Sequence, residues 1–116
     1  MPPQITPEEV KQIVASGKQY CLLLLKLGPN QSLDKAAIEK DQMEHLQYLL
    51  GLKRDGILPL FGPVTDGGDL RGIGIFTITD RGKIKVLMDA DPHIKSGRLR
   101  YELYGWFGIP GDSLPN

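Results

Sequence analysis

The side chains best suited to chemistry in this chain are two histidines and one aspartate. Histidine is the side chain whose ordinary pKa lies nearest neutral pH, and it is the commonest general acid or base in enzymes. The chain has two, His45 and His93, and Asp91 stands shortly before the second. A carboxylate beside a histidine fixes the tautomer of the ring and favours its protonated form. His45 and Asp91 would therefore form an acid–base pair if the fold brought them together.

These residues also have purely structural interpretations. His45 falls on the flank of an apolar helix face, where a lone histidine can be a hydrogen-bonded core residue. Asp91 precedes a proline and can simply end a helix. We expect His93 to be solvated, because it follows Asp-Pro in a polar turn. A zinc or iron site can be drawn from both histidines, Asp89 and Asp91, but its spacing matches no standard ligand set, so we predict no metal site.

Other motifs indicate little further chemistry. Gly72-Ile73-Gly74 lies inside a predicted strand with no helix after it, which excludes a dinucleotide-binding loop. No P-loop lysine motif, HExxH or GxSxG occurs, so neither a nucleophile nor a cofactor is expected. The single cysteine, Cys21, stands in an apolar run, which predicts a buried core thiol.

The composition limits the class of protein. The 116 residues are 41% hydrophobic and 24% charged, which is typical of one globular domain. Fourteen basic residues balance fourteen acidic ones, so no net positive charge favours nucleic acid. One cysteine fits a reducing compartment. No signal peptide is visible, and the longest apolar run, Cys21–Leu25, is far below the ~20 residues of a membrane span. We therefore expect a cytoplasmic protein with no nucleic-acid or membrane partner.

The first histidine lies in the clearest predicted helix, over residues 34–55. At about 100° per residue, His45 falls between Leu49 and Leu52, which places its ring at the flank of the buried stripe. Gly51 is unfavourable inside a helix by about 1 kcal/mol, and we expect it to permit close backbone packing.

The rest of the pattern predicts an extra helix and four strands. The helix begins at Thr6-Pro7 and stops at Gly17, and the strands cover 20–27, 57–64, 71–79 and 99–107. Residues 80–91 fit either a strand or a helix, because alternation and helical spacing are both present. If this segment is a helix, the order is the β-α-β-β-α-β of a ferredoxin-like α+β domain. Its sheet would have one bare face, and we expect a second copy of the chain to cover that face in a homodimer.

A set of short motifs then points to a family. They are His45-Leu46-Gln47-Tyr48-Leu49, Gly56-Ile57-Leu58, Phe61-Gly62-Pro63-Val64, Arg71-Gly72, Asp91-Pro92, Lys95-Ser96-Gly97 and Tyr104-Gly105-Trp106. In this order and spacing the chain resembles the YCII-related (YciI-like) proteins over roughly residues 20–106.

The resemblance implies a fold and a site. It implies a ferredoxin-like domain that dimerises through its sheets into an α+β barrel, with a helix from about Arg81 to Ala90. Relatives include muconolactone-isomerase-type enzymes and a dehydrochlorinase of chlorinated hydroxyquinols. The His–Asp pair proposed as their active site corresponds to His45 and Asp91. The expected organisation is an N-terminal helical extension (1–19), a YciI-like domain (20–107) and a C-terminal tail (108–116).

We predict from this a small-molecule lyase or isomerase. His45 would act as general base or acid on an aromatic or enol-type substrate, and Asp91 would orient it. Gly62 and Pro63 would leave room for the substrate. Arg71 would either pair with an anionic substrate group or be a solvated hairpin residue. The alternatives are a non-catalytic dimeric domain that binds a ligand or partner, and a haem-related protein with His45 as axial ligand.

Overall fold

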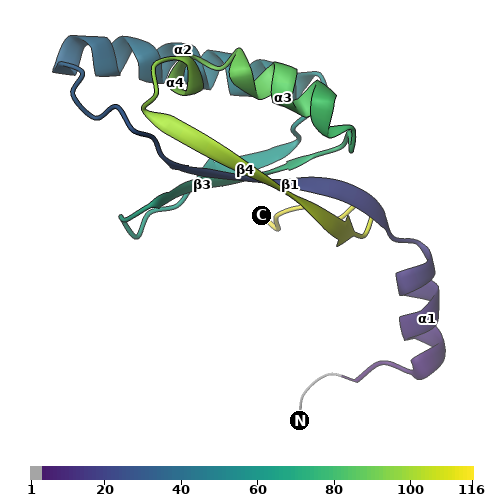
Figure 1. The fold of residues 1–116 in the computed structure, drawn as a ribbon. Helices are drawn as coiled ribbons and strands as arrows, with labels where there is room; N and C mark the ends of the chain where they lie inside the picture. Colours follow the sequence, from purple (N-terminus) through teal and green to yellow (C-terminus); the bar gives the residue numbers. More distant parts are fainter. Residues whose placement is uncertain (1–3) are drawn as a thin grey trace.

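The computed structural model describes residues 4–116, which form one four-stranded sheet and four helices (Figure 1). The strands are β1 (Lys18–Leu27), β2 (Leu60–Pro63), β3 (Leu70–Phe76) and β4 (Leu99–Gly108), and the helices are α1 (Pro7–Ala15), α2 (Lys35–Arg54), α3 (Arg81–Asp89) and α4 (Pro92–Lys95). The strand order is β2-β3-β1-β4, and every neighbouring pair is antiparallel. This confirms the predicted ferredoxin-like α+β fold with an extra N-terminal helix.

The core lies between the sheet and helices α2 and α3, which cover the same face of the sheet (Figure 1). Alternate residues of β1 point into this core, and Cys21, Leu23 and Leu25 are all buried. Phe76 from β3 and Ile84 from α3 are fully buried against them. Burial raises the pKa of the Cys21 thiol, so the predicted core thiol is confirmed and is a poor nucleophile.

Helix α3 occupies the segment whose pattern was ambiguous. The carboxylate of Asp80 accepts a hydrogen bond from the amide of Lys83 (3.1 Å) and so begins the helix. Ile84 and Met88 are fully buried on its inner face. The helical spacing was therefore the correct signal, and the alternation of Lys83 to Val86 was misleading.

Strand β2 is shorter than the predicted strand over 57–64. The amides of Ile57 and Leu58 both donate to the carbonyl of Leu52 (2.9 and 3.2 Å), which completes the end of α2. The amide of Thr77 then donates to the carbonyl of Ile57 (3.0 Å), just beyond the end of β3. These residues connect the helix to the sheet, and this connection explains why fewer of them pair as strand.

Two glycines in β3 have a packing role. A Cβ atom on Gly72 would lie 3.2 Å from the carbonyl oxygen of Gly62, and one on Gly74 would lie 3.0 Å from the side chain of Leu58. Both positions face the buried side of the sheet. By contrast, a Cβ on Gly51 in α2 would meet no atom within 4 Å. The expectation that Gly51 permits close packing is therefore wrong.

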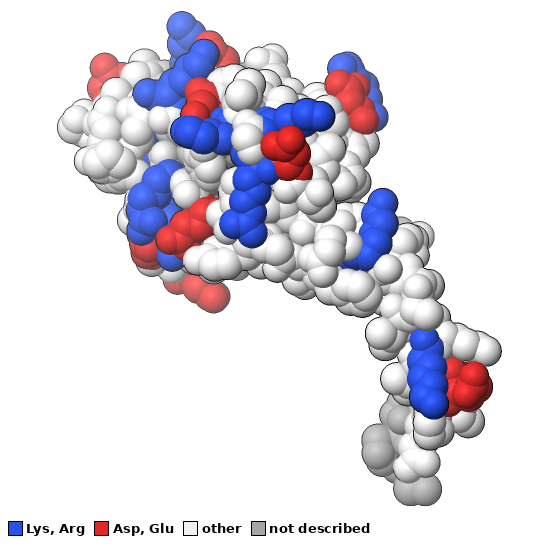
Figure 2. All heavy atoms as spheres, turned by 45° about the vertical axis from the view of Figure 1, so that its right-hand side comes forward, with Lys and Arg blue, Asp and Glu red and all other residues white. Residues whose placement is uncertain are grey.

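Helix α1 projects away from the rest of the molecule (Figures 1 and 2). Its capping box is formed by Thr6 and Glu9, as its sequence indicates. No residue of α1 is buried, although Val10, Ile13 and Val14 are apolar. The radius of gyration is 16.9 Å, compared with about 13 Å for a compact domain of this length. The helix is an arm on the domain and not a part of its core.

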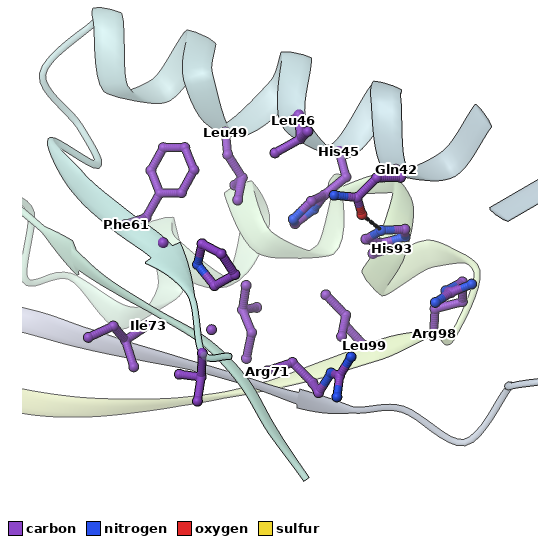
Figure 3. A pocket seen from close by; sticks show the side chains of 15 residues that line it. Gln42, His45, Leu46, Leu49, Phe61, Arg71, Ile73, His93, Arg98 and Leu99 are labelled. Atoms are coloured by element: carbon purple, nitrogen blue, oxygen red, sulfur yellow. Dashed lines mark hydrogen bonds between the residues drawn. The ribbon is translucent and has the colours of Figure 1, made fainter. Parts of the chain in front are cut away.

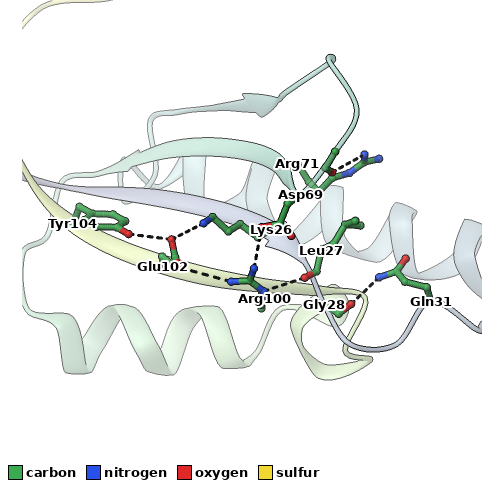
Figure 4. A network of polar contacts seen from close by, with 10 residues as sticks. Lys26, Leu27, Gly28, Gln31, Asp69, Arg71, Arg100, Glu102 and Tyr104 are labelled. Atoms are coloured by element: carbon green, nitrogen blue, oxygen red, sulfur yellow. Dashed lines mark hydrogen bonds and ion pairs between the residues drawn. The ribbon is translucent and has the colours of Figure 1, made fainter.

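The face of the sheet opposite the helices carries exposed apolar side chains. Ile73, Tyr104 and Trp106 are 46%, 47% and 42% exposed. At one end of this face Glu102 accepts hydrogen bonds from Lys26 (3.0 Å) and Tyr104 (3.0 Å), in a polar network shown in Figure 4. We call this surface the open face; it comprises Tyr20, Leu22, Leu24, Leu60, Ile73, Ile75, Tyr104 and Trp106. Ile109 and residues 111–114 line a groove beside part of it.

Within residues 4–116, no helix combines the length and apolar character required to cross a lipid bilayer.

Candidate acid–base site

His45 and Asp91 lie in direct contact, although they are distant in the sequence. The Nδ1 atom of His45 and the Oδ1 atom of Asp91 are 2.7 Å apart. Asp91 is fully buried and His45 is 7% exposed. Because the carboxylate accepts this hydrogen bond, Nδ1 is the donor, and Nε2 is the ring atom left for a ligand.

The local structure explains why the carboxylate of Asp91 is available. Asp91 stands between α3 and α4 in extended conformation, and Pro92 begins α4. Its backbone carbonyl accepts from the amides of Ile94 (3.1 Å) and Lys95 (2.9 Å), but its side chain caps nothing. The predicted helix break therefore becomes a joint between two helices, and the side chain at this joint points at α2.

Within residues 4–116, His45 is the side chain that is hydrogen-bonded to the carboxylate of Asp91. Its second oxygen, Oδ2, is buried without a hydrogen-bond partner among residues 4–116. A buried carboxylate is costly unless it is paired. Tyr48 is nearby, but its hydroxyl donates to the carbonyl of Leu87 (2.7 Å). Burial and the negative charge of Asp91 raise the pKa of Tyr48, so it remains a neutral phenol.

His93 is the main surprise of the site. The sequence predicts it to be solvated, yet it is only 3% exposed. Its ring lies against that of His45, with centroids 4.5 Å apart and planes inclined by 32°. The prediction was wrong because Pro92 starts a short helix, α4, whose first turn packs against α2 and carries His93 inward.

The partners of His93 indicate a neutral ring. Nε2 lies 2.7 Å from the Oε1 atom of Gln42 and donates to it (Figure 3). Nδ1 is then left as an acceptor, 3.8 Å from the carboxylate of Asp41, and has no hydrogen bond within the described residues. Burial lowers the pKa of His93, and the adjacent positive charge of a protonated His45 lowers it further.

A pocket of about 240 Å³ lies beside this pair of rings. Gly62, Pro63 and Arg71, which the sequence analysis assigned to the substrate, line it together with His45. Asp91 does not line it, but it is hydrogen-bonded to His45, which does. The lining residues that complete the pocket are Leu25, Gln42, Leu46, Leu49, Phe61, Val64, Gly72, Ile73, His93, Arg98 and Leu99 (Figure 3).

Arg71 lies at the edge of this pocket. Its neighbour Gly72 pairs with Leu25 on the buried side of the sheet, so the alternation of the strand places Arg71 on the other side. Its guanidinium donates to the carbonyl of Gly68 (3.4 Å) in the hairpin loop.

Sequence reasoning missed Gln42, His93 and Arg98 as members of the site. Gln42 precedes His45 by one helical turn, and this spacing alone could have placed it on the same face. The burial of His93 and the position of Arg98 depend on α4, which had no clear sequence signal. Among the residues that the structure describes, no cluster of three His, Cys, Asp or Glu side chains could hold a metal ion.

The fold and the pocket define a class: a ferredoxin-like α+β domain with a buried His–Asp pair at a small pocket. A comparison with protein-family models gives no match, and neither does one with curated protein sequences. Among solved structures, the chain is similar to 5-chloro-2-hydroxyhydroquinone dehydrochlorinase (TftG) from Burkholderia phenoliruptrix AC1100, in complex with 2,5-dihydroxybenzoquinone. The TM-score is 0.54 at 20% identity, over 73% of this chain and 92% of the dehydrochlorinase. This likeness supports the assignment of the fold.

Proposed function

We propose that this protein is a small-molecule lyase or isomerase in which His45 transfers the proton. The observation that carries the proposal is the 2.7 Å hydrogen bond between His45 and the fully buried Asp91, at the wall of a pocket. The similarity in fold to a dehydrochlorinase of a hydroxylated ring supports the reaction class. So does the resemblance to YciI-like proteins.

The proposed chemistry follows from the orientation of the ring. Nε2 of His45 accepts a proton from a carbon or hydroxyl group of the substrate, and Asp91 stabilises the imidazolium that forms. In a lyase, the electron pair of the broken bond forms a double bond while a leaving group departs from the adjacent atom. In an isomerase, His45 returns the proton to another carbon. Both reactions are redox-neutral and need only one group that cycles between two protonation states.

The pocket favours a flat substrate whose ring faces are apolar. Phe61, Leu46 and Leu49 supply apolar walls, and Pro63 closes the side formed by β2. Its volume of about 240 Å³ is below the range usual for drug-sized ligands, which suits a single ring with a few substituents. Gly62 and Pro63 are proposed to contact this ring, and Arg71 to lie at the entrance.

A turnover screen of the wild type and one variant tests the proposal. Chlorinated hydroquinols and muconolactone-like lactones are incubated with wild type and with His45→Ala, and product is measured by chromatography and chloride release. We expect turnover in wild type and a loss of about 100-fold or more in the variant. Full activity in a folded His45→Ala would show that another group is the base. Binding without turnover of any compound would favour a ligand-binding domain, and a coloured protein as purified would favour haem.

We also propose that the open face is covered by a second copy of this chain. An apolar patch with a charged network at one end is the usual composition of a protein interface. The exposed Ile73, Tyr104 and Trp106 form the apolar part, and Lys26 and Glu102 form the charged end. The same surface on both subunits can pair about a two-fold axis.

A further inference from the structure

The charge of the pocket lining differs from that of the chain as a whole. The chain has equal numbers of acidic and basic residues, yet the lining contains Arg71, Arg98, His45 and His93 and no acidic residue. Two carboxylates lie near the histidines, but neither of them lines the pocket. Asp91 faces Nδ1 of His45, and Asp41 lies 3.8 Å from Nδ1 of His93. His93 is neutral, but the two arginines leave only positive charge in the lining, and a cleft whose charged groups share one sign attracts ligands of the opposite sign.

Two arginines of this lining, Arg71 and Arg98, have no ion-pair partner among residues 4–116, but the guanidinium of Arg71 donates to the carbonyl of Gly68 at the edge of the pocket. Arg98 stands just before β4, and Figure 3 shows its side chain at the end of the pocket next to His93. Among residues 4–116 no carboxylate lies within 4 Å of its guanidinium. Its Nε atom is buried without a hydrogen-bond partner in the same range. Its charge also acts on His93, whose pKa it helps to lower.

A comparison with Arg100 shows how unusual this is. Arg100 lies two positions along the same segment, and it donates to the carbonyl of Leu27 (3.1 Å) and to the carboxylate of Asp69 (2.9 Å). It also lies 3.7 Å from Glu102 (Figure 4). Arg98 is partly exposed and lines the pocket without an ion-pair partner among residues 4–116, so an acidic group of a ligand is the counter-ion that its guanidinium can take.

We propose that the substrates of this pocket are small anions, and that Arg98 is the residue that selects them. The ligand class is an unsaturated ring or enol that carries a carboxylate. The carboxylate would pair with the guanidinium of Arg98, while the reacting part of the molecule lies against Nε2 of His45. A guanidinium suits this role because its fixed N–H groups match the two oxygens of a carboxylate. This inference rests on the proposed function for the choice of pocket, but it makes a claim about binding alone.

The test compares two ligands that differ in one group, a carboxylate or an uncharged carboxamide. Binding of 2,5-dihydroxybenzoate and of 2,5-dihydroxybenzamide is measured by calorimetry and by NMR titration of the histidine ring protons. We expect the wild type to bind the benzoate more tightly than the benzamide. In Arg98→Gln the affinity for the benzoate should fall by about 10- to 100-fold, with little change for the benzamide. Arg98→Lys should recover part of the preference, because it restores the charge without the fork of N–H groups.

The control is Arg100→Gln, which removes one positive charge from the same segment but outside the pocket. It should leave both affinities unchanged. Equal binding of the two ligands by the wild type would overturn the inference. So would an equal loss of affinity for the benzoate in Arg98→Gln and Arg100→Gln. Tight, Arg98-dependent binding without any turnover would refute the proposed function and leave this inference standing. Turnover of neutral substrates that is unaffected by Arg98→Gln would refute this inference and leave the proposed function standing.

Discussion

The ring of His93 lies against the ring of His45 with centroids 4.5 Å apart, and only one of the two has a carboxylate within hydrogen-bond distance. His45 is bonded to Asp91, whereas His93 is bonded to the neutral amide of Gln42. Two adjacent positive charges in a buried site repel each other. The geometry therefore separates the roles of the two histidines: one can carry charge, and the other is kept neutral beside it.

The carboxylate of Asp91 gives the most direct prediction about activity. In Asp91→Asn the amide can present N–H to His45 Nδ1, which would select the tautomer with its proton on Nε2 and remove the stabilising charge. Activity on any substrate found in the screen should fall by about 100-fold or more. The matched control is Asp89→Asn, which changes an exposed aspartate bonded to Lys85 and Tyr101. Equal rates for wild type and Asp91→Asn would contradict the assigned role.

The neutral state of His93 predicts a dependence of stability on pH. Its pKa is lowered in the folded protein, so below about pH 6.5 the unfolded chain binds a proton at this position that the folded protein does not. Acid therefore favours unfolding through this residue, by at most about 1.4 kcal/mol for each pH unit. Urea unfolding at pH 7.5 and 5.5 should show a smaller loss of stability in His93→Phe than in wild type. The same loss in both proteins would show that His93 is not the group responsible.

The contrast between two glycines predicts opposite effects on stability. Gly51→Ala replaces a helical glycine in open space and should raise the free energy of unfolding by about 0.5–1 kcal/mol. Gly74→Ala puts a methyl group 3.0 Å from Leu58 and 3.2 Å from Phe61 and should lower it, by about 1–3 kcal/mol. Chemical denaturation of the two variants measures both values. A stabilised Gly74→Ala would show that the buried side of β3 has room to spare.

The open face predicts a change in oligomeric state. Sedimentation of the wild type should give the mass of a dimer, and Tyr104→Lys should shift it toward the monomer because it places a charge in the proposed interface. Val86→Lys serves as control, since Val86 is 71% exposed on α3, on the helix side of the sheet. A wild-type protein that sediments as a monomer would refute the dimer.

Much of the scaffold follows from the sequence because its signals are local. The positions of α1, α2 and the strands, the capping of α1 and the burial of His45 between Leu49 and Leu52 all rest on periodicity and caps. The helix α3 is different, because periodicity left residues 80–91 open and the family resemblance implied a helix there. The boundaries of β2 were less accurate, since the amides of Ile57 and Leu58 bond to the end of α2 instead of a neighbouring strand. Hydrogen bonds of this kind between separate elements do not change the local periodicity of the sequence, so they cannot be predicted from it.

The composition of the site was harder to predict than the scaffold. Spacing could not show that His45 and Asp91 meet, and their pairing was available only through a resemblance. His93 was misplaced because a helix of four residues gives too short a pattern to be read from periodicity. Arg98 belongs to no sequence motif. Its lack of a hydrogen-bond acceptor at Nε is a property of the three-dimensional structure and cannot be read from the sequence.

The arm formed by α1 has a practical consequence. A nine-residue helix is too short to be stable in water without contacts, and this one has a capping box and a C-cap at Ser16 but no buried residue. Its amide hydrogens should therefore exchange with solvent almost as fast as those of an unfolded peptide when the chain is alone. Slow amide exchange at Val10, Ile13 and Val14 would indicate that another molecule is bound to α1.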